Sequence, residues 1–221
     1  MTSYAFDISH LLAGSLVLVS FMMLYQDRMY ALLRTFAFQA FLLALAVAWQ
    51  AFTQNAPHLY ATAAIALIFK ALIVPWALAR VVARMGIQRT VETVTGVVPT
   101  MLLGMGLVAL SILLMLRLTE AAGNPLARED LAFALSAILL GLLMMVTRRN
   151  AVTQVVGFMS LENGLILAAA GAQGMPLVVE ISVAFSVLVA MIVIGVFLFR
   201  IRERFDSVDI EALDAFRGER Q

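Results

Sequence analysis

Long apolar stretches dominate this chain and set what it can fold into. A helix needs about 20 apolar residues to cross the hydrocarbon core of a bilayer. The sequence divides into seven such stretches, and 63% of its residues are apolar, against roughly 45–50% in a soluble domain. We therefore predict an all-α membrane protein, a bundle of seven transmembrane helices. The expected spans are Ile8–Tyr25, Leu33–Phe52, Leu59–Val81, Val97–Leu116, Leu131–Val146, Val152–Gly171 and Leu177–Phe199.

The polar connections between the stretches predict turns and an orientation. Turn residues occur at Asn55-Ala56-Pro57, Gly123-Asn124-Pro125 and Gly174-Met175-Pro176. Basic residues gather in cytoplasmic connections, and here the first, third and fifth connections and the start of the tail carry arginines. The second and sixth connections carry none, so we expect the N-terminus outside and the C-terminus in the cytoplasm. The arginines are Arg28, Arg34, Arg80, Arg84, Arg89, Arg148, Arg149, Arg200, Arg202 and Arg204.

Composition argues against several classes of function. The chain has no cysteine, so it offers no disulfide, no ligand for an iron–sulfur cluster and no thiolate nucleophile. Its two histidines are too few to indicate a metal centre. A net charge of +1 without a basic stripe gives no sign of nucleic-acid binding. We expect a subunit without an active site, cofactor or metal of its own.

Two charged side chains fall inside the apolar stretches. Lys70, the only lysine, lies midway along the third stretch, and Glu162 lies near the middle of the sixth. A charge at membrane depth costs roughly 2.5–3.5 kcal/mol on insertion scales, and such residues are usually functional. A carboxyl that faces protein or water can gain and lose a proton, as an ion relay requires. The alternative is a permanently neutral acid that bonds helices together through Ser160 or Asn163.

Lys70 needs a partner at that depth. A lone ammonium near the bilayer centre requires a carboxylate, a water-filled pocket or deprotonation. Pro75, five residues later, should kink the helix by freeing a backbone carbonyl. Our hypothesis is that Lys70 pairs with Glu162 or with a residue of an adjacent subunit, and we favour the adjacent subunit. Glu180 is a third relay candidate, although an interfacial carboxylate without function is an equal alternative. Gln39 of the second stretch could line a polar path or bond between helices.

Three groups of residues in the last three stretches carry a resemblance to a known family: Arg148-Arg149-Asn150, Gly157 to Ala169 with Ser160-Leu161-Glu162 at its centre, and Asp206-Ser207-Val208. Through them, the chain from about Leu131 onward is similar to the K subunit of respiratory complex I, a small protein of three spans. A longer chain with four more spans in front resembles component E of the hydrogenase-4 and formate hydrogenlyase group, membrane-bound [NiFe]-hydrogenase complexes related to complex I.

The resemblance implies a division of the chain and one departure from the family. The expected parts are four additional spans at 1–126, a K-like three-helix unit at 127–201 and a cytoplasmic amphipathic tail at 202–221. The K subunit has a glutamate at the middle of its second span, which Glu162 matches. It has another in its third span, near Val187 of this chain, and Glu180 lies about two helical turns away. The two-glutamate relay of the family therefore does not carry over whole.

The expected function follows from this resemblance. The chain looks like a membrane-arm subunit of a redox-driven, hydrogenase-4-like complex of the bacterial inner membrane, contributing to proton or sodium translocation through Glu162 and Lys70. Its expected partners are the lipid bilayer and other membrane subunits of a group 4 [NiFe]-hydrogenase-like complex, including antiporter-like subunits. Two alternatives stay open: a passive scaffold subunit of such a complex, and a stand-alone secondary transporter. No clear inverted repeat or pair of broken helices supports the transporter.

Overall fold

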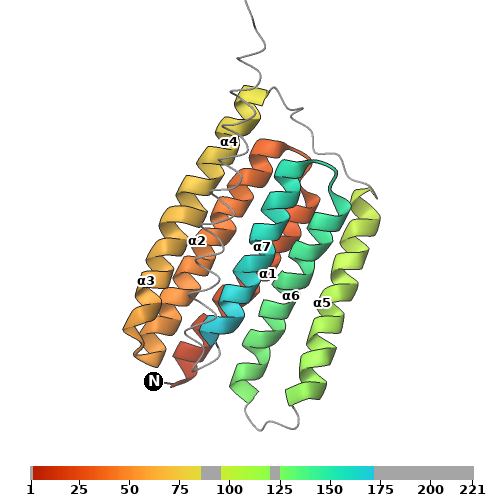
Figure 1. The fold of residues 1–221 in the computed structure, drawn as a ribbon. Helices are drawn as coiled ribbons and strands as arrows, with labels where there is room; N and C mark the ends of the chain where they lie inside the picture. Colours follow the sequence, from red (N-terminus) through yellow and green to blue (C-terminus); the bar gives the residue numbers. More distant parts are fainter. Residues whose placement is uncertain (1, 86–95, 120–124, 172–221) are drawn as a thin grey trace, which may run out of the picture. The chain divides into compact units, whose positions relative to one another are not determined.

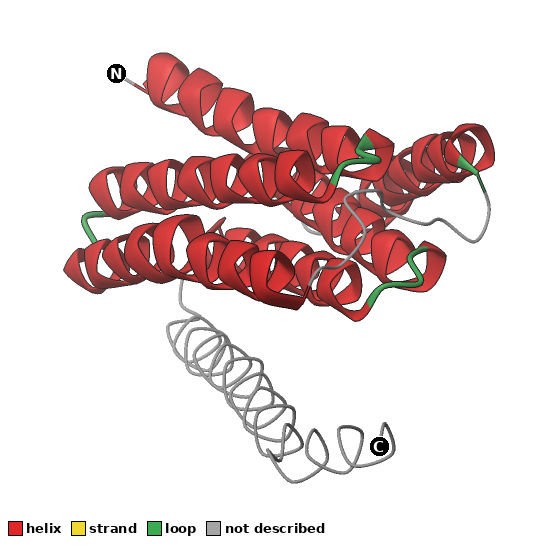
Figure 2. Cartoon of the chain, turned by 90° about the horizontal axis from the view of Figure 1, so that it is seen from above, coloured by secondary structure: helices red, strands yellow, loops and turns green. Residues whose placement is uncertain are grey.

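The computed structural model describes residues 2–85, 96–119 and 125–171, all of which belong to one compact unit, Met1–Ser186. The described residues form helices joined by short connections, with no strand among them (Figure 2). This confirms the all-α prediction for this part of the chain. The elements are α1 (Thr2–Tyr25), α2 (Met29–Gln54), α3 (Pro57–Ile65), the π-helix η1 (Ala66–Ile73), α4 (Val74–Met85), α5 (Val97–Thr119), α6 (Pro125–Thr147) and α7 (Ala151–Gly171) (Figure 1).

Six stretches of the described residues are long and apolar enough to cross a membrane. They match the first six expected spans, and α3, η1 and α4 together form the third. The seventh expected span, Leu177–Phe199, lies outside the described residues, as do Glu180, the tail and the turn at Gly174-Met175-Pro176. The six spans are Phe6–Tyr25, Met29–Gln54, Pro57–Ala83, Val97–Met115, Asp130–Thr147 and Ala151–Gly171.

Among the described helices, α2 has the most neighbours. α2 packs against α1, against α7 and along α3, η1 and α4, while α1 also packs against α5 and α6. α6 lies between α5 and α7 and contacts both (Figure 1). The apolar core where α1, α2, α3, α6 and α7 meet is rich in alanine. Small side chains let these helices approach closely. The resulting van der Waals contacts hold the helices together in lipid, where no hydrophobic force drives them to associate.

Consecutive spans run in opposite directions, so their connections gather at two ends (Figure 1). The α1–α2 connection, the α6–α7 connection and the end of α4 share one end. The opposite end holds the α2–α3 connection and the first turns of α1 and α6. We call the first the arginine-rich end because it carries Arg28, Arg34, Arg80, Arg148 and Arg149.

The turn at Asn55-Ala56-Pro57 is confirmed. Asn55 follows α2 with φ 54° and ψ 40°, a left-handed conformation that asparagine tolerates, and its N–H donates to the carbonyls of Ala51 and Phe52. These bonds satisfy carbonyls that the end of a helix leaves open. Pro57 then begins α3, where its missing N–H has no helical partner to lose. Local sequence therefore decides this reversal.

The third span differs from the expected proline kink. The eight residues Ala66–Ile73 form a π-helix, and the N–H of Val74 donates to the carbonyl of Phe69, five residues back. Pro75 has no N–H, and its ring crowds the carbonyl four residues earlier in a regular helix. The wider turn accommodates this crowding within a continuous helix. Lys70 lies within this π-helix with its side chain buried, and π-turns often occur at functional sites.

Three glycines let α6 and α7 touch along their backbones. A Cβ added to Gly141 would clash with the amide nitrogen of Leu161 and lie 2.7 Å from its Cα. A Cβ on Gly164 would lie 2.8 Å from the nitrogen of Ile138, and one on Gly157 would also contact α6 at close range. The contact fixes the position and rotation of α7, which carries Glu162.

Arg148 has a structural role at the arginine-rich end. Its Nη2 donates to the carbonyls of Met23 at 3.2 Å, Leu24 at 2.8 Å and Gln26 at 3.0 Å, at the last turn of α1. A cation at this position satisfies open carbonyls and opposes the negative end of the helix dipole. Burial lowers the pKa of the guanidinium, and the Asp27 carboxylate acts to raise it. Arg148 therefore joins the α6–α7 connection to α1.

We predict that Gly141→Ala destabilises the protein while Gly106→Ala does not. The new methyl group at position 141 would overlap the backbone of α7, and overpacking of this kind costs about 1–3 kcal/mol. Gly106 in α5 has open space around its Cβ position, so alanine there should be neutral or slightly stabilising through helix propensity. Thermal unfolding in detergent, followed by circular dichroism, measures both. Equal midpoints for the two variants would contradict the close contact.

Candidate functional site

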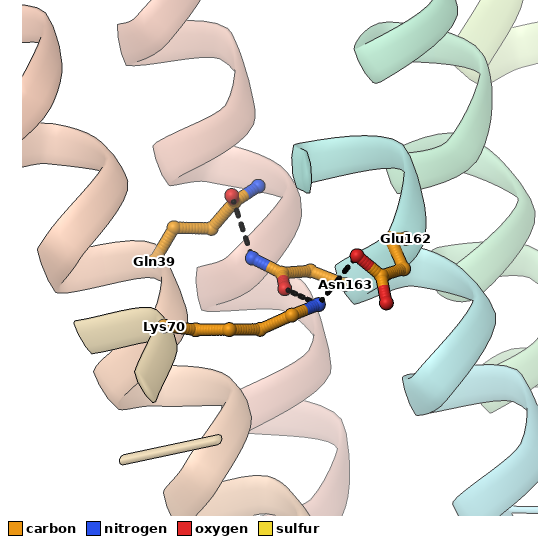
Figure 3. A network of polar contacts seen from close by, with 4 residues as sticks. All are labelled: Gln39, Lys70, Glu162 and Asn163. Atoms are coloured by element: carbon orange, nitrogen blue, oxygen red, sulfur yellow. Dashed lines mark hydrogen bonds and ion pairs between the residues drawn. The ribbon is translucent and has the colours of Figure 1, made fainter. Parts of the chain in front are cut away.

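The centre of the candidate site is a buried ion pair between the third and sixth spans. The Nζ of Lys70 lies 3.2 Å from Oε2 of Glu162, and their side chains are 2% and 3% exposed. The same Nζ donates a hydrogen bond of 2.9 Å to Oδ1 of Asn163. Figure 3 shows the lysine side chain reaching from η1 towards both residues of α7. Each charge is thus removed from solvent and lies against its opposite.

Hydrogen bonds extend from this pair to two more helices. Nδ2 of Asn163 donates to Oε1 of Gln39 at 3.1 Å (Figure 3). Nε2 of Gln39 then donates to the hydroxyls of Ser20 at 2.7 Å and Ser160 at 2.8 Å. The hydroxyl of Ser20 donates to the carbonyl of Leu16 in its own helix. We call Ser20, Gln39, Lys70, Ser160, Glu162 and Asn163 the polar network; all six residues are buried.

The positions of these residues follow from helix geometry and packing. Ser160 and Asn163 are three residues apart on α7, so they share a face, and both bond Gln39 of α2. The glycine contact presses another side of α7 against α6. Since α2 lies between α1 and α7, an amide at position 39 reaches both neighbours. The α3–η1–α4 span contributes Lys70, which lies in the π-helix and reaches α7.

This arrangement can hold a mobile proton. A buried amine beside a carboxyl has two protonation arrangements, an ion pair and a neutral pair, and both keep the hydrogen bond between the groups. Asn163 bonds Lys70 on one side and Gln39 on the other, and Gln39 bonds the serine hydroxyls. The two amides therefore orient the pair and link it to the serines. Buried polar groups that are mutually bonded are strongly coupled in a low-dielectric interior. No group of three or more His, Asp or Glu side chains gathers to hold a metal within the described ranges.

The structure reverses one expectation about Lys70 and tests others. Of the two expected partners of Lys70, the structure pairs it with Glu162 of the same chain rather than with the adjacent subunit that the sequence slightly favours. Gln39 bonds between helices, which is one of the two expected alternatives. Glu180 lies outside the described residues. Sequence reasoning missed Ser20, whose only signal is a hydroxyl inside an otherwise apolar stretch.

A second polar cluster lies at the end opposite the arginine-rich end. His10 Nδ1 of α1 lies 3.6 Å from Oδ1 of Asp130 in α6, and both side chains are partly exposed. Gln50 of α2 donates to Oδ2 of Asp130 at 3.4 Å. Gln54, one turn later, donates to Gln50 and to the carbonyl of Ala170 in α7. These residues join α1, α2, α6 and α7, and the distance along the chain hides the contact from sequence reasoning.

Comparisons with known proteins give two kinds of relative. The chain is 32% identical over 210 residues to the uncharacterized protein Rv0085 of Mycobacterium tuberculosis (strain ATCC 25618 / H37Rv), covering 93% of this chain and 94% of that protein. It is 34% identical over 117 residues to hydrogenase-4 component E of Escherichia coli (strain K12) and of Shigella flexneri. The latter matches span 51% of this chain and 54% of each relative, about half of both. No family model and no solved structure matches the chain.

We predict strong thermodynamic coupling between the members of the ion pair. Lys70→Met leaves the Glu162 carboxylate buried without its cation, and breaking a buried pair from one side costs about 3–5 kcal/mol. Glu162→Gln alone likewise leaves a buried ammonium. The double variant, Lys70→Met with Glu162→Gln, removes both charges and should lose less stability than the two single losses added together. Unfolding free energies of the three variants in detergent close the cycle, and simple additivity would show that the pair is not coupled.

Proposed function

Since the chain belongs to the same family as Rv0085 of Mycobacterium tuberculosis, and half of it matches hydrogenase-4 component E, we propose that it is a membrane subunit of a hydrogenase-like complex and contributes to proton or sodium translocation. The observation that carries the proposal is the Lys70–Glu162 ion pair, buried inside two apolar spans. Charges at this depth are expensive and generally mark ion or proton pathways.

In this proposal the ion pair responds to an event in a neighbouring subunit. A charge that appears near the network changes the relative free energies of the ion pair and the neutral pair. Coupling between two sites is typically worth about 1–3 kcal/mol, enough to change their populations many-fold. The proton then moves between Lys70 and Glu162 while Asn163 and Gln39 keep both groups oriented. Redox chemistry belongs to partner subunits, because a chain without cysteine offers no thiolate for a cluster.

The proposed partners are the other membrane subunits of such a complex, antiporter-like subunits among them. The proposed membrane is the bacterial inner membrane, with the arginine-rich end in the cytoplasm. The charge distribution supports this orientation, since Arg28, Arg34, Arg148 and Arg149 lie at one end while the α2–α3 connection at the other carries no basic residue except a histidine.

A passive scaffold is the second candidate function, and burial of the network favours it. The six side chains are closed from solvent and bonded to one another, as a permanent bond between spans would be. Under this alternative Glu162 never changes its proton, and Lys70 only holds η1 against α7. A variant that keeps the hydrogen bonds but cannot titrate separates the two candidates.

We predict that complexes with Glu162→Gln which still assemble, despite the stability that the broken pair costs, keep their redox turnover but lose ion translocation severalfold. Glutamine keeps the size of the side chain and most of its hydrogen bonding, and it removes the titrating group. The measurement compares redox turnover and proton uptake in inverted membrane vesicles, after the subunits that co-purify with the chain have been identified. Asp7→Asn is the matched control, because Asp7 is exposed at the start of α1.

Each outcome of that experiment has one meaning. Full translocation by an assembled Glu162→Gln complex would rule out the relay and favour the scaffold. A chain that purifies without hydrogenase-like or antiporter-like subunits, and moves ions alone in vesicles, would be a stand-alone transporter. Loss of translocation in both Glu162→Gln and Asp7→Asn would indicate a general effect of lost negative charge.

Orientation gives a further prediction. Reporter fusions that end after Arg149 should report the cytoplasm, because the arginine-rich end retains its positive charge on that side during insertion. Fusions that end after Pro57 should report the outside. Paired reporters, alkaline phosphatase and green fluorescent protein, measure the two locations independently. A cytoplasmic signal after Pro57 would reverse the proposed orientation.

A further inference from the structure

The span that carries Lys70 on its inner side carries a second charge on its outer side. Within α4, Val74, Leu78 and Val82 are buried, whereas Trp76 and Arg80 are exposed. Trp76 is 59% exposed. The arginine and the tryptophan are four residues apart and therefore share a helix face. That face points away from the described part of the protein.

The side chains of Trp76 and Arg80 contact each other on this face. Cζ of the guanidinium lies 4.5 Å from the centroid of the indole ring, a cation–π contact. The two side chains border an open hollow of about 350 Å³, and Ala79 and Ala83 also line it on the described part of the chain. Alanines at these positions leave the space that larger side chains would fill. A planar cation is thus held at the edge of a cavity.

Arg80 has no carboxylate partner among the described residues. It lies within the candidate span Pro57–Ala83, three positions before its end. Ten residues separate it from Lys70, about 15 Å at 1.5 Å per residue, which is half the thickness of the hydrocarbon core. If Lys70 lies near the midplane, the guanidinium lies at the level of the lipid headgroups. An outward-facing arginine at that level requires an anion or water.

We propose that Trp76, Ala79, Arg80 and Ala83 form a binding site for the phosphate headgroup of an anionic phospholipid in the leaflet at the arginine-rich end. The guanidinium offers two parallel N–H donors to phosphate oxygens. The indole covers the apolar part of the lipid next to the headgroup, as tryptophan does at membrane interfaces. The alanines make room for the glycerol backbone.

Lipid is favoured over free phosphate because of where the hollow lies. Its walls are an indole, two methyl groups and the stem of an arginine, on the outer face of a span. A soluble anion would meet one donor group and an apolar surface. A phospholipid presents its phosphate to the guanidinium and its apolar part to the remaining walls. Binding therefore requires both the phosphate and the apolar part of the lipid.

Fluorescence quenching tests the proposal in the full chain. The chain has two tryptophans, Trp49 and Trp76, so the Trp49→Phe variant reports Trp76 alone. The variant is reconstituted into nanodiscs that contain increasing fractions of brominated phosphatidylglycerol or brominated phosphatidylcholine. We expect half-maximal quenching at an about fivefold lower fraction of phosphatidylglycerol, since one basic residue near the surface is worth about 1 kcal/mol towards anionic lipid. Inorganic phosphate should not reverse the quenching.

Two matched variants decide whether Arg80 causes the selectivity. Arg80→Gln should make the two lipids quench Trp76 alike. Arg34→Gln removes an exposed arginine of α2 near the same end and should leave the selectivity unchanged. Equal quenching by both lipids before substitution, or selectivity that survives Arg80→Gln, would overturn the proposal. Reversal by inorganic phosphate would instead assign the site to a free anion, and protection of Trp76 in the assembled complex would assign it to a partner subunit.

Native mass spectrometry keeps the test independent of the Trp49→Phe variant. The wild-type chain, released from detergent, should retain phosphatidylglycerol in preference to phosphatidylcholine. Arg80→Gln should abolish this preference, and Arg34→Gln should not. Equal retention of both lipids by the wild-type chain would contradict the proposed site.

Discussion

The described fold depends on the burial of one lysine and one glutamate in an apolar interior. Neither charge is stable at that depth alone, so α7 and the third span must meet where Lys70 and Glu162 lie. The Lys70 side chain links η1 to α7, with its Nζ 3.2 Å from the Glu162 carboxylate. Asn163 and Gln39 extend the constraint to α2, and Ser20 extends it to α1. Loss of either charge would expose the other to the full cost of burial.

Two backbone features bring the pair together. The glycines of α6 and α7 remove the side chains that would hold the helices apart, and Gly141 contacts the backbone next to Glu162. Lys70 lies within the π-helix before Pro75, and its side chain is buried. The opposite charges attract each other, and the backbones of α7 and the third span hold them within reach. An alanine at position 141 would displace α7 without changing either charge.

The third span carries two cations, and each is stabilised in a different way. Lys70 points inward and takes a carboxylate of its own chain, whereas Arg80 points outward and rests on an indole. An inward pair is shielded from salt and bulk water, which suits a group whose protonation follows events in a neighbouring subunit. An outward cation depends on its surroundings, which suits lipid recognition. The homology to hydrogenase-4 component E places these features in a chain related to a hydrogenase component, while the resemblance to the complex I K subunit stays a prediction.

Sequence by itself determined that the described chain is helical, where six apolar spans lie, how the turn at Asn55-Ala56-Pro57 forms, and which two charges are unusual. Hydropathy, turn propensity and proline chemistry act over a few residues, so they can be read locally. Tertiary structure alone decided that Lys70 bonds Asn163, 93 positions away in α7, that Arg148 caps α1, and that His10 lies near Asp130. These contacts depend on helix rotation and on close backbone approach at glycines, which arise only when distant segments pack together.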